Sequence, residues 1–208
     1  MIMKFKELDR LLSRYRLVLA SGSPRRVSLL RAAGINFRQL IPDIDENNHA
    51  HQDPSALATF LAQKKALAVC WEIETDEVIL GCDTIVILNN LVLGKPESEA
   101  EAFEMLSALS GNRHTVCSAI ALLERGGYMA SGFEFTDVYF NPVSAAQIKA
   151  YIKTGEPLDK AGAYGIQEEG GFLVDRIEGN VDNVIGLPMS LLERLAGKFM
   201  TEMSCYGI

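Results

Sequence analysis

The chain passes from an expected strand to an expected helix at Leu17-Val18-Leu19-Ala20-Ser21-Gly22-Ser23-Pro24-Arg25-Arg26. The apolar run 17–20 predicts a buried strand, and residues 27–33 predict a helix that ends at Gly34. Ser23 is a favourable N-cap, and Pro24 suits the first helical position. Backbone N–H groups, two hydroxyls and two guanidinium groups would converge there, which suits a phosphate oxygen. Taken alone, the stretch favours a plain capped helix with two solvated arginines.

Composition and charge restrict the classes of protein that fit this chain. With 208 residues, 48% of them hydrophobic, it can bury the core of one large domain or two intimate lobes. A formal net charge of −7 disfavours a general nucleic-acid binder, which needs a basic face. Four widely spaced cysteines predict reduced thiols rather than a zinc site or a disulfide framework. No window has the roughly 20 apolar residues that span a membrane, so we expect a cytoplasmic protein without a membrane segment.

Further along, strands and helices alternate without a regular βαβ rhythm. This pattern predicts an α/β fold of mixed α+β character, with a mixed sheet and flanking helices. Capping boxes are expected at Ser98 and Ser144, each followed three residues later by Glu or Gln. The other expected elements are helices over 54–71 and 187–199, β-rich stretches over 114–123 and 132–140, and a strand over 78–88 interrupted at Gly81-Cys82-Asp83-Thr84.

Asp83 is an acid inside an otherwise apolar strand. Burying a bare carboxylate costs several kcal/mol unless a cation or hydrogen bonds compensate. It therefore predicts a metal ligand or a general base at the floor of a cleft. The alternative is an acid at a strand end or bulge, paired with a structural arginine. Glu46, in a loop after a short strand, could join Asp83 in holding Mg²⁺, which takes one or two carboxylates plus substrate phosphates.

Three lysines are candidates for binding an anion. Lys64 and Lys65 belong to the expected helix, and a helical projection places Lys64 near the middle of its apolar side and Lys65 near the edge. A partly buried ammonium needs an anion, although a snorkelling stem explains the pattern equally well. Lys95 precedes Pro96 in a turn, which restricts its backbone to extended geometry. The projection takes the apolar side as Leu57, Phe60, Leu61 and Ala68.

The glycine-rich segment 155–167 has the composition of a ligand-binding loop. Its glycines allow the backbone to approach a ligand closely. Asp159 and Lys160 offer charge, and the Gln167 amide can pair with the edge of a nucleobase. A mobile surface loop is the alternative.

Together these segments resemble the Maf family, whose members are nucleoside triphosphate pyrophosphatases also described as septum-formation inhibitors. The resemblance runs over about residues 16–195. Its motifs, in chain order, are S-G-S-P-R-R, I-D-E, K-A at Lys65-Ala66, G-C-D-T, G-K-P, L-S-G, G-E-P-x-D-K-A-G-A-Y-G-I-Q and V-I-G-L-P. The chain departs from the usual pattern at Lys64, where glutamate is commoner, and at Cys82, where alanine or serine is usual.

The resemblance implies a fold, a reaction and a set of roles. The fold would be a single domain over residues 1–208, with a helical extension over 1–15, elongated and two-lobed around a central cleft, similar to inosine triphosphate pyrophosphatases. The reaction would be hydrolysis between the α- and β-phosphates, with Mg²⁺ or Mn²⁺ as cofactor. Asp83 would be the proton acceptor, and Glu46 with Asp83 would hold the metal. The phosphate-facing or substrate-binding set would be Ser21, Ser23, Arg25, Arg26, Lys65, Lys95, Asp159 and Lys160.

Three further matches imply the substrate. Arg25, Thr84 and Gln167 carry the residue types of the dTTP/UTP branch, whereas the branch acting on 7-methyl-GTP tends to have tryptophan, glutamine and glutamate there. We therefore expect a dTTP/UTP pyrophosphatase that works on a free nucleotide, with a homodimer implied by family analogy. The alternatives are a 7-methyl-GTP pyrophosphatase and a non-catalytic, nucleotide-binding regulator of septum formation. The cellular purpose, pool cleaning or division control, stays open.

Overall fold

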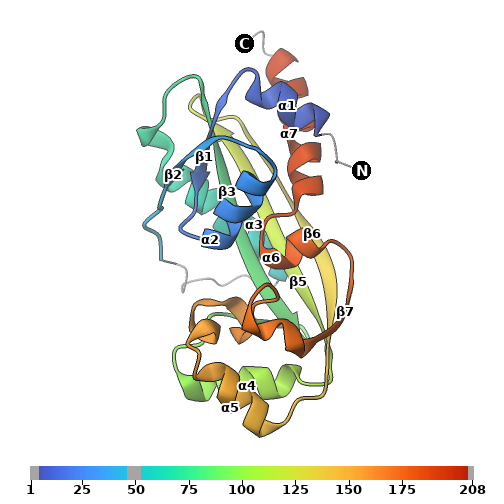
Figure 1. Cartoon of the computed structure of the whole chain (residues 1–208). Helices are drawn as coiled ribbons and strands as arrows, with labels where there is room; N and C mark the ends of the chain where they lie inside the picture. Colours follow the sequence, from blue (N-terminus) through green and yellow to red (C-terminus); the bar gives the residue numbers. More distant parts are fainter. Residues whose placement is uncertain (1–4, 46–52, 206–208) are drawn as a thin grey trace. The chain divides into compact units, whose positions relative to one another are not determined.

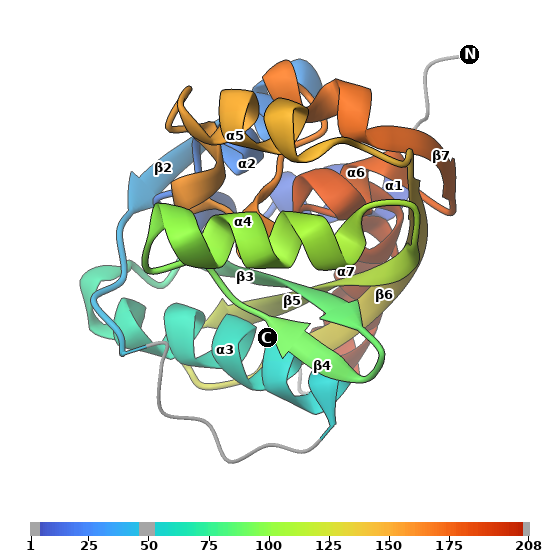
Figure 2. The ribbon, with the colours of Figure 1, turned by 90° about the horizontal axis from the view of Figure 1, so that it is seen from below.

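A seven-stranded mixed sheet organises the protein, and the computed structural model describes residues 5–45 and 53–205. Six strands follow the order β2-β1-β3-β5-β6-β7, and β4 pairs with β3. β1 (Arg16–Ala20) is parallel to β2 (Phe37–Leu40) and to β3 (Glu77–Leu88). β4 (Leu91–Leu93) is antiparallel to β3, as β7 (Val174–Glu178) is to β6 (Met129–Phe140). The expected mixed sheet with flanking helices is confirmed (Figures 1 and 2).

The chain divides into two compact units, and β3, β5 (Arg113–Glu124) and β6 each contribute to both. The first unit comprises residues 1–83, 119–134 and 186–208. Its α1 (Lys6–Leu12) packs along α7 (Met189–Cys205), as Figure 1 shows. Phe199 of α7 is fully buried and meets the rings of Tyr15 and Tyr128 edge-on, with centroids 5.9 and 5.1 Å away.

The second unit comprises residues 84–118 and 135–185. Its helices α4 (Glu99–Leu109) and α5 (Ala145–Ile152) lie side by side (Figures 1 and 2). Leu106, Leu109 and Ile148 from these helices are buried in the core of the unit. Three 3₁₀ turns follow α5, and then come β7 and α6 (Val181–Ile185). The turns are η2 (Glu156–Asp159), η3 (Ala161–Ala163) and η4 (Glu169–Leu173). That one domain spans the whole chain stays a prediction.

β3 is covered on both faces in the first unit. Val78, Leu80 and Cys82 point into the core that α1 and α7 share. Successive residues of a strand point to opposite faces, so Ile79, Gly81 and Asp83 point the other way. There α3 (Pro54–Ala68) packs directly on the strand, because a Cβ added to Gly81 would meet the Ala62 carbonyl oxygen and the Ala66 side chain.

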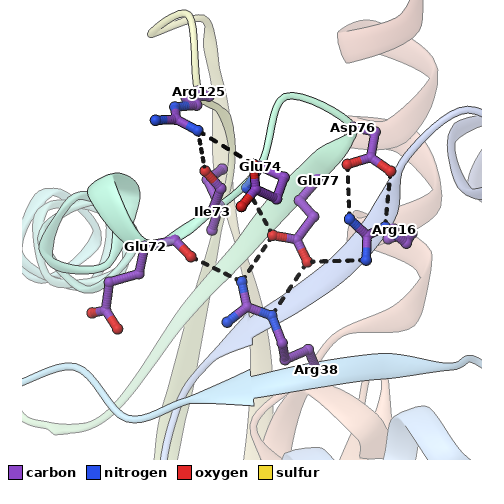
Figure 3. Close-up of polar contacts among 8 residues, drawn as sticks. All are labelled: Arg16, Arg38, Glu72, Ile73, Glu74, Asp76, Glu77 and Arg125. Carbon is purple, nitrogen blue, oxygen red and sulfur yellow. Dashed lines mark hydrogen bonds and ion pairs between the residues drawn. The ribbon is translucent and has the colours of Figure 1, made fainter.

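A network of ion pairs closes the amino ends of β1 and β3 (Figure 3). Glu77, only 2% exposed, accepts hydrogen bonds from Arg38 Nε at 3.2 Å and Nη2 at 2.8 Å. Arg16 donates to both oxygens of Asp76. Arg125 bonds the Ile73 carbonyl, and Nη1 lies 3.7 Å from Glu74. These side chains anchor the segment that leads into β3 to strands β1 and β2.

Several local expectations are confirmed and four are corrected. The capping box at Ser144 is present. Ser98 caps α4, but the box expected there is incomplete, because the Glu101 carboxylate accepts from the Glu97 N–H instead of from Ser98. β3 is continuous through residues 81–84 rather than interrupted. α3 ends at Ala68, and a separate 3₁₀ turn, η1 (Cys70–Glu72), follows. Ser23 occupies the N-cap of α2 (Pro24–Ala32), yet its side chain makes no capping bond. All four cysteines are described, and none forms a disulfide. Among the described residues, no helix is long and apolar enough to cross a membrane.

Candidate active site

Lys65 and Asp83 form a buried ion pair on the α3 side of β3. The Lys65 Nζ lies 2.6 Å from Asp83 Oδ1, and the two residues are 8% and 6% exposed. Burial on this scale is rare for charged side chains unless they are paired. The structure therefore shows which of the two adjacent lysines pairs with Asp83. Lys64 is only half-buried and donates instead to the Asp45 carbonyl.

The helical projection of α3 was right about Leu57 and Leu61, which are buried, and wrong about Phe60 and Ala68, which are exposed. The other buried positions include the small residues Ala58, Ala62 and Ala66. The reason is the direct contact at Gly81, which admits only small side chains between helix and strand. Asp83 follows Gly81 by two positions and so shares its face of the strand. The contact therefore places Lys65, which lies next to Ala66, over Asp83.

A second buried polar pair lies just after β1. Ser21 and Arg26 are 3% and 7% exposed. The Ser21 hydroxyl accepts a hydrogen bond from Arg26 Nη1 at 2.9 Å and another from the Ser23 N–H at 3.2 Å. Arg26 Nε donates to the Gly186 carbonyl at 2.8 Å. The arginine is thus fixed at the start of α2, as binding of an anion there requires, while Arg25 is half-buried.

The two pairs lie around the same point of the sheet. Ala20, the last residue of β1, is in register with Gly81, so the chain leaves β1 beside Cys82 and Asp83. The charges of Arg26, Lys65 and Asp83 all act on the Cys82 thiol. Burial, with Asp83 acting in the same direction, outweighs the two cations and raises the pKa of Cys82 to about 11. This thiol therefore stays protonated and is a packing residue rather than a nucleophile.

Thr84 belongs to a polar network in the second unit. Its Oγ1 lies 2.8 Å from Ser118 Oγ on β5, and Ser118 donates to the Asn183 carbonyl at 2.8 Å. Asn183 is fully buried, and its amide donates to the Val116 carbonyl and to Thr136 Oγ1. The network joins β3, β5 and β6 to α6. Residue 84 is therefore held in place by three neighbouring elements.

Asp159 and Lys160 line a cavity of about 520 Å³ in the second unit, whereas Gln167 and Lys95 are not among its lining residues. Lys160 is 6% exposed, and its Nζ donates to the Glu156 carbonyl at 2.7 Å and lies 2.8 Å from Asp159 Oδ1. Gln167 is exposed, and so is Lys95. The Gly162 N–H donates to the Gly94 carbonyl at 2.9 Å, which holds the turn of Lys95 beside the segment of Lys160. The residues that line the cavity are Thr154, Gly155, Glu156, Asp159, Lys160, Glu168 and Glu169.

Residues 16–199 match the family model described as Maf-like protein. The chain belongs to the Maf family. Curated Maf relatives named "dTTP/UTP pyrophosphatase" match along almost their whole length. Those from Bacillus cereus and Bacillus thuringiensis subsp. konkukian are 42% and 41% identical over 189 residues, 91% of this chain and 98% of each relative. The one from Bacillus anthracis is 41% identical with the same coverage.

A solved structure of a nucleoside-triphosphatase / dITP/XTP pyrophosphatase from Mycobacterium abscessus is a more distant likeness. It is 13% identical, with a TM-score of 0.39, over 62% of this chain and 75% of that one. The expected kinship of the Maf fold to inosine triphosphate pyrophosphatases therefore stays a prediction.

The metal ligands expected for a Maf protein are described only in part. Glu46 lies outside the described residues, and Asp83 is the described member of the pair. Within residues 5–45 and 53–205 there is no group of three or more His, Cys, Asp or Glu side chains that could hold a metal ion. A single buried carboxylate still fits Mg²⁺, which takes hard oxygen ligands and completes its shell with water and substrate phosphates.

Sequence reasoning overlooked several residues of this Maf protein that hold others in place. Ser118 lies in a β-rich stretch with nothing to distinguish it, and the sequence around Asn183 indicates only a structural role. Tyr151, whose hydroxyl bonds Glu156 and Gly165, falls outside the motifs. A polar-tipped aromatic near a helix end, just before a glycine-rich segment, is a signal that could have found it.

Proposed function

We propose that this protein hydrolyses dTTP and UTP between the α- and β-phosphates, releasing a monophosphate and pyrophosphate. The buried Lys65–Asp83 pair carries the proposal. Burying a carboxylate in an apolar strand, here at 6% exposure, costs folding free energy, and a role in the reaction would explain why the protein keeps it. The names of the curated Maf relatives support the same reaction.

Asp83 is proposed to orient or deprotonate the attacking water. Proton transfer by a positioned carboxylate contributes about 100-fold or more to a rate. Lys65 fixes the carboxylate in place, because its ammonium lies 2.6 Å from Asp83 Oδ1. The water attacks the α-phosphorus in line, and the pyrophosphate departs with the electron pair of the broken P–O bond.

The basic side chains are proposed to balance the charge of the triphosphate. Positioned donors stabilise charge that develops on a leaving group. Arg26 is already held by Ser21 and Gly186, so little ordering is needed when the substrate binds. Ser23, Arg25, Lys95, Asp159 and Lys160 are the further candidates for contacting the substrate.

A divalent cation is proposed as cofactor, held by Asp83 together with Glu46. When bound, Mg²⁺ or Mn²⁺ would neutralise charge on the phosphate oxygens. We expect chelation with EDTA to abolish turnover and added Mg²⁺ or Mn²⁺ to restore it. Full activity in EDTA would remove the metal from the proposal.

Selection of the base is proposed to rest on Arg25, Thr84 and Gln167. The exposed Gln167 amide can both donate to O4 and accept from N3–H of a 4-keto pyrimidine. Replacing Gln167 by glutamate removes the donor, so we expect dTTP and UTP turnover to fall more than stability does. An unchanged preference among nucleotides would exclude Gln167 from this role.

The deciding experiment measures pyrophosphate release from dTTP, UTP, CTP, 7-methyl-GTP, ATP and GTP. We expect preferred release from dTTP and UTP, and a loss of at least about 100-fold in kcat for Asp83→Asn. Asp76→Asn, an exposed acid of the same unit, is the matched control and should keep full activity. A preference for 7-methyl-GTP would keep the reaction and overturn the pyrimidine assignment. No turnover by folded protein would favour a non-catalytic regulator of septum formation.

The setting of the enzyme is proposed on the family resemblance. We propose a cytoplasmic protein with a free nucleotide as substrate, no nucleic-acid partner and a homodimeric state. Light scattering during size-exclusion chromatography tests the last point, and a mass of 22.8 kDa across the concentration range would contradict it.

A further inference from the structure

The segment that carries Lys160 and Gln167 has little regular structure to hold it. Between α5 and β7 its regular structure is limited to the short turns η2, η3 and η4, and a five-residue stretch, 164–168, separates η3 from η4. Gln167 is exposed and lies between η3 and η4. A side chain that reads a base edge must be held within a fraction of an ångström, since a misplacement of about 1 Å can cost about 100-fold in rate. Some contact must therefore fix the backbone on both sides of Gln167.

Tyr151 and Glu156 provide such contacts. The Tyr151 hydroxyl accepts a hydrogen bond from the Gly165 N–H at 3.1 Å and donates to Glu156 Oε1 at 3.0 Å. The other carboxylate oxygen, Oε2, accepts from the Glu169 N–H at 3.0 Å. The backbone is thus held two residues before Gln167 and two residues after it. One tyrosine and one glutamate connect the two points.

The packing around Tyr151 requires glycine at two positions of the segment. A Cβ added to Gly170 would lie 2.5 Å from the Tyr151 hydroxyl oxygen and would also meet the Gly165 carbonyl. A Cβ added to Gly165 would lie 2.9 Å from Glu156 Oε1 and 2.8 Å from Lys160 Cε. Both glycines therefore let the backbone approach the tyrosine–glutamate pair closely.

The backbone of Glu156 also holds Lys160. Its Nζ donates to the Glu156 backbone carbonyl at 2.7 Å, and Glu156 lines the cavity beside it. Burial raises the pKa of the Tyr151 hydroxyl, so the hydroxyl keeps its proton and remains a donor to the carboxylate. The contacts therefore have one fixed direction: Gly165 donates to Tyr151, and Tyr151 donates to Glu156.

We propose that Tyr151 and Glu156 are positioning residues for nucleotide selection, which hold Gln167 at the place where it reads the pyrimidine base. The inference rests on the proposed function and adds to it two residues outside the groups that touch the substrate. It distinguishes them from residues that only stabilise the fold, because their loss should act on substrate choice through Gln167.

Tyr151→Phe tests the proposal, because it removes the hydroxyl and keeps the ring that meets Phe172 edge-on at 5.9 Å. We expect the preference for dTTP over dCTP, as a ratio of kcat/KM, to fall about tenfold, the scale of roughly one lost hydrogen bond. The KM for dTTP should rise more than kcat falls. Tyr139→Phe is the matched control, since it removes a hydroxyl that bonds the exposed Glu178 in the same unit.

A second variant separates positioning from general stability. If Tyr151 acts through Gln167, Tyr151→Phe should cause no further loss of selectivity in a protein that already carries Gln167→Ala. Equal melting temperatures for Tyr151→Phe and Tyr139→Phe would show that stability does not explain the difference. An unchanged dTTP/dCTP ratio in Tyr151→Phe, or additive losses in the double variant, would overturn the inference. A wild-type protein without turnover would instead overturn the proposed function.

Discussion

Lys65 and Lys64 show that the contribution of a charged side chain to stability depends on its exact position in the helix. The ion pair of Lys65 is buried, whereas the neighbouring Lys64 is half-buried and meets only a backbone carbonyl among its described hydrogen bonds. Removing one partner of a buried pair is costly because the other charge remains out of water. Removing a charge near the surface changes little.

We therefore expect Lys65→Met and Lys64→Met to differ sharply. Lys65→Met should lower the free energy of unfolding by about 3–5 kcal/mol, and Lys64→Met should change it by no more than about 0.5 kcal/mol. Urea unfolding followed by circular dichroism measures both. Equal losses would mean that the Lys65–Asp83 pair contributes nothing specific.

His114 gives the second unit a pH dependence. It is 2% exposed, and Nε2 lies 2.7 Å from the Tyr164 hydroxyl. Burial lowers its pKa from 6.5 to about 4, and the nearby Asp137 opposes the shift only partly. Between these two values the unfolded chain binds a proton that the folded protein does not. The free energy of unfolding should therefore decrease as the pH is lowered from 6.5 to about 4, by about 3 kcal/mol in all.

His114→Gln tests this dependence, because the amide removes the titrating group and keeps a polar side chain beside Tyr164. Unfolding free energies measured from about pH 7 to about pH 4 should fall for the wild type and stay flatter for the variant. Parallel curves would show that His114 does not titrate differently on folding.

At this scale the sequence predicted which residues are unusual better than it predicted their partners. Asp83 stood out as an acid among apolar neighbours, and it is buried. The sequence did not predict that Lys65, and not Lys64, would be buried. The helical projection placed the large apolar side chains on the inner side of the helix, whereas the close contact at Gly81 requires small ones there. Tyr151 did not follow either, since its hydrogen bonds depend on where the chain returns after several turns.

At the scale of elements, the close packing of α3 on β3 holds Lys65 next to Asp83. Gly81 leaves room for the Ala62 carbonyl oxygen, which belongs to the helix backbone and cannot rotate away. A side chain at residue 81 must therefore push α3 from the strand, and Lys65 moves with it. Overpacking of this kind typically costs about 1–3 kcal/mol.

Gly81→Ala should accordingly lose both stability and turnover. We expect the free energy of unfolding to drop by about 1–3 kcal/mol, and pyrophosphate release to fall as Lys65 separates from Asp83. Gly94→Ala serves as the stability control, because a Cβ there meets nothing within 4 Å. A Gly81→Ala protein as stable as this control would contradict the close packing of α3 on β3.

Element types followed from the sequence more reliably than their continuity did. The capping box of Ser144 and the cap of Ser98 mark real helix starts. The interruption expected at residues 81–84 does not occur. Lys65 neutralises the buried charge of Asp83, and Thr84 forms a hydrogen bond with Ser118 on the neighbouring strand. Both partners come from distant segments, so the sequence around β3 contained no sign of them.

At the scale of the whole molecule, acid acts on the two units in different pH ranges. The second unit responds through His114, below its ordinary pKa of 6.5. The first unit responds through Glu77, whose hydrogen bonds from Arg38 hold its pKa below the ordinary 4.5 (Figure 3). A carboxylate with a lowered folded pKa stabilises the protein above its unfolded pKa, and that stability is lost as pH falls below it.

Glu77→Gln should therefore flatten only the more acidic part of the stability curve. We expect the variant to be less stable than the wild type at neutral pH and to lose less stability between about pH 4.5 and pH 3. Glu72→Gln is the control, since Glu72 bonds Arg38 through its backbone carbonyl rather than its carboxylate. Equal slopes for the wild type and Glu77→Gln in this range would contradict the prediction.

The general architecture was accessible from the sequence, and the family resemblance implied two lobes, whereas the position of the boundary between them was not accessible. Alternating helix and strand signals without a βαβ rhythm predicted the mixed sheet that the structure has. The boundary between the units falls inside β3, between Asp83 and Thr84, where no linker, glycine run or change of composition marks it. Three strands that continue from one unit into the other leave no local signal of a boundary.

The alternation of β3 at this boundary bears on how such a protein can diverge. Asp83 points toward α3 and Lys65, whereas its neighbour Thr84 points to the other face and meets Ser118. With the roles proposed above for Asp83 and Thr84, a change at residue 84 would alter the choice of nucleotide without disturbing the carboxylate one position earlier. Related hydrolases with those roles would then acquire new substrates through single substitutions while they keep the same chemistry.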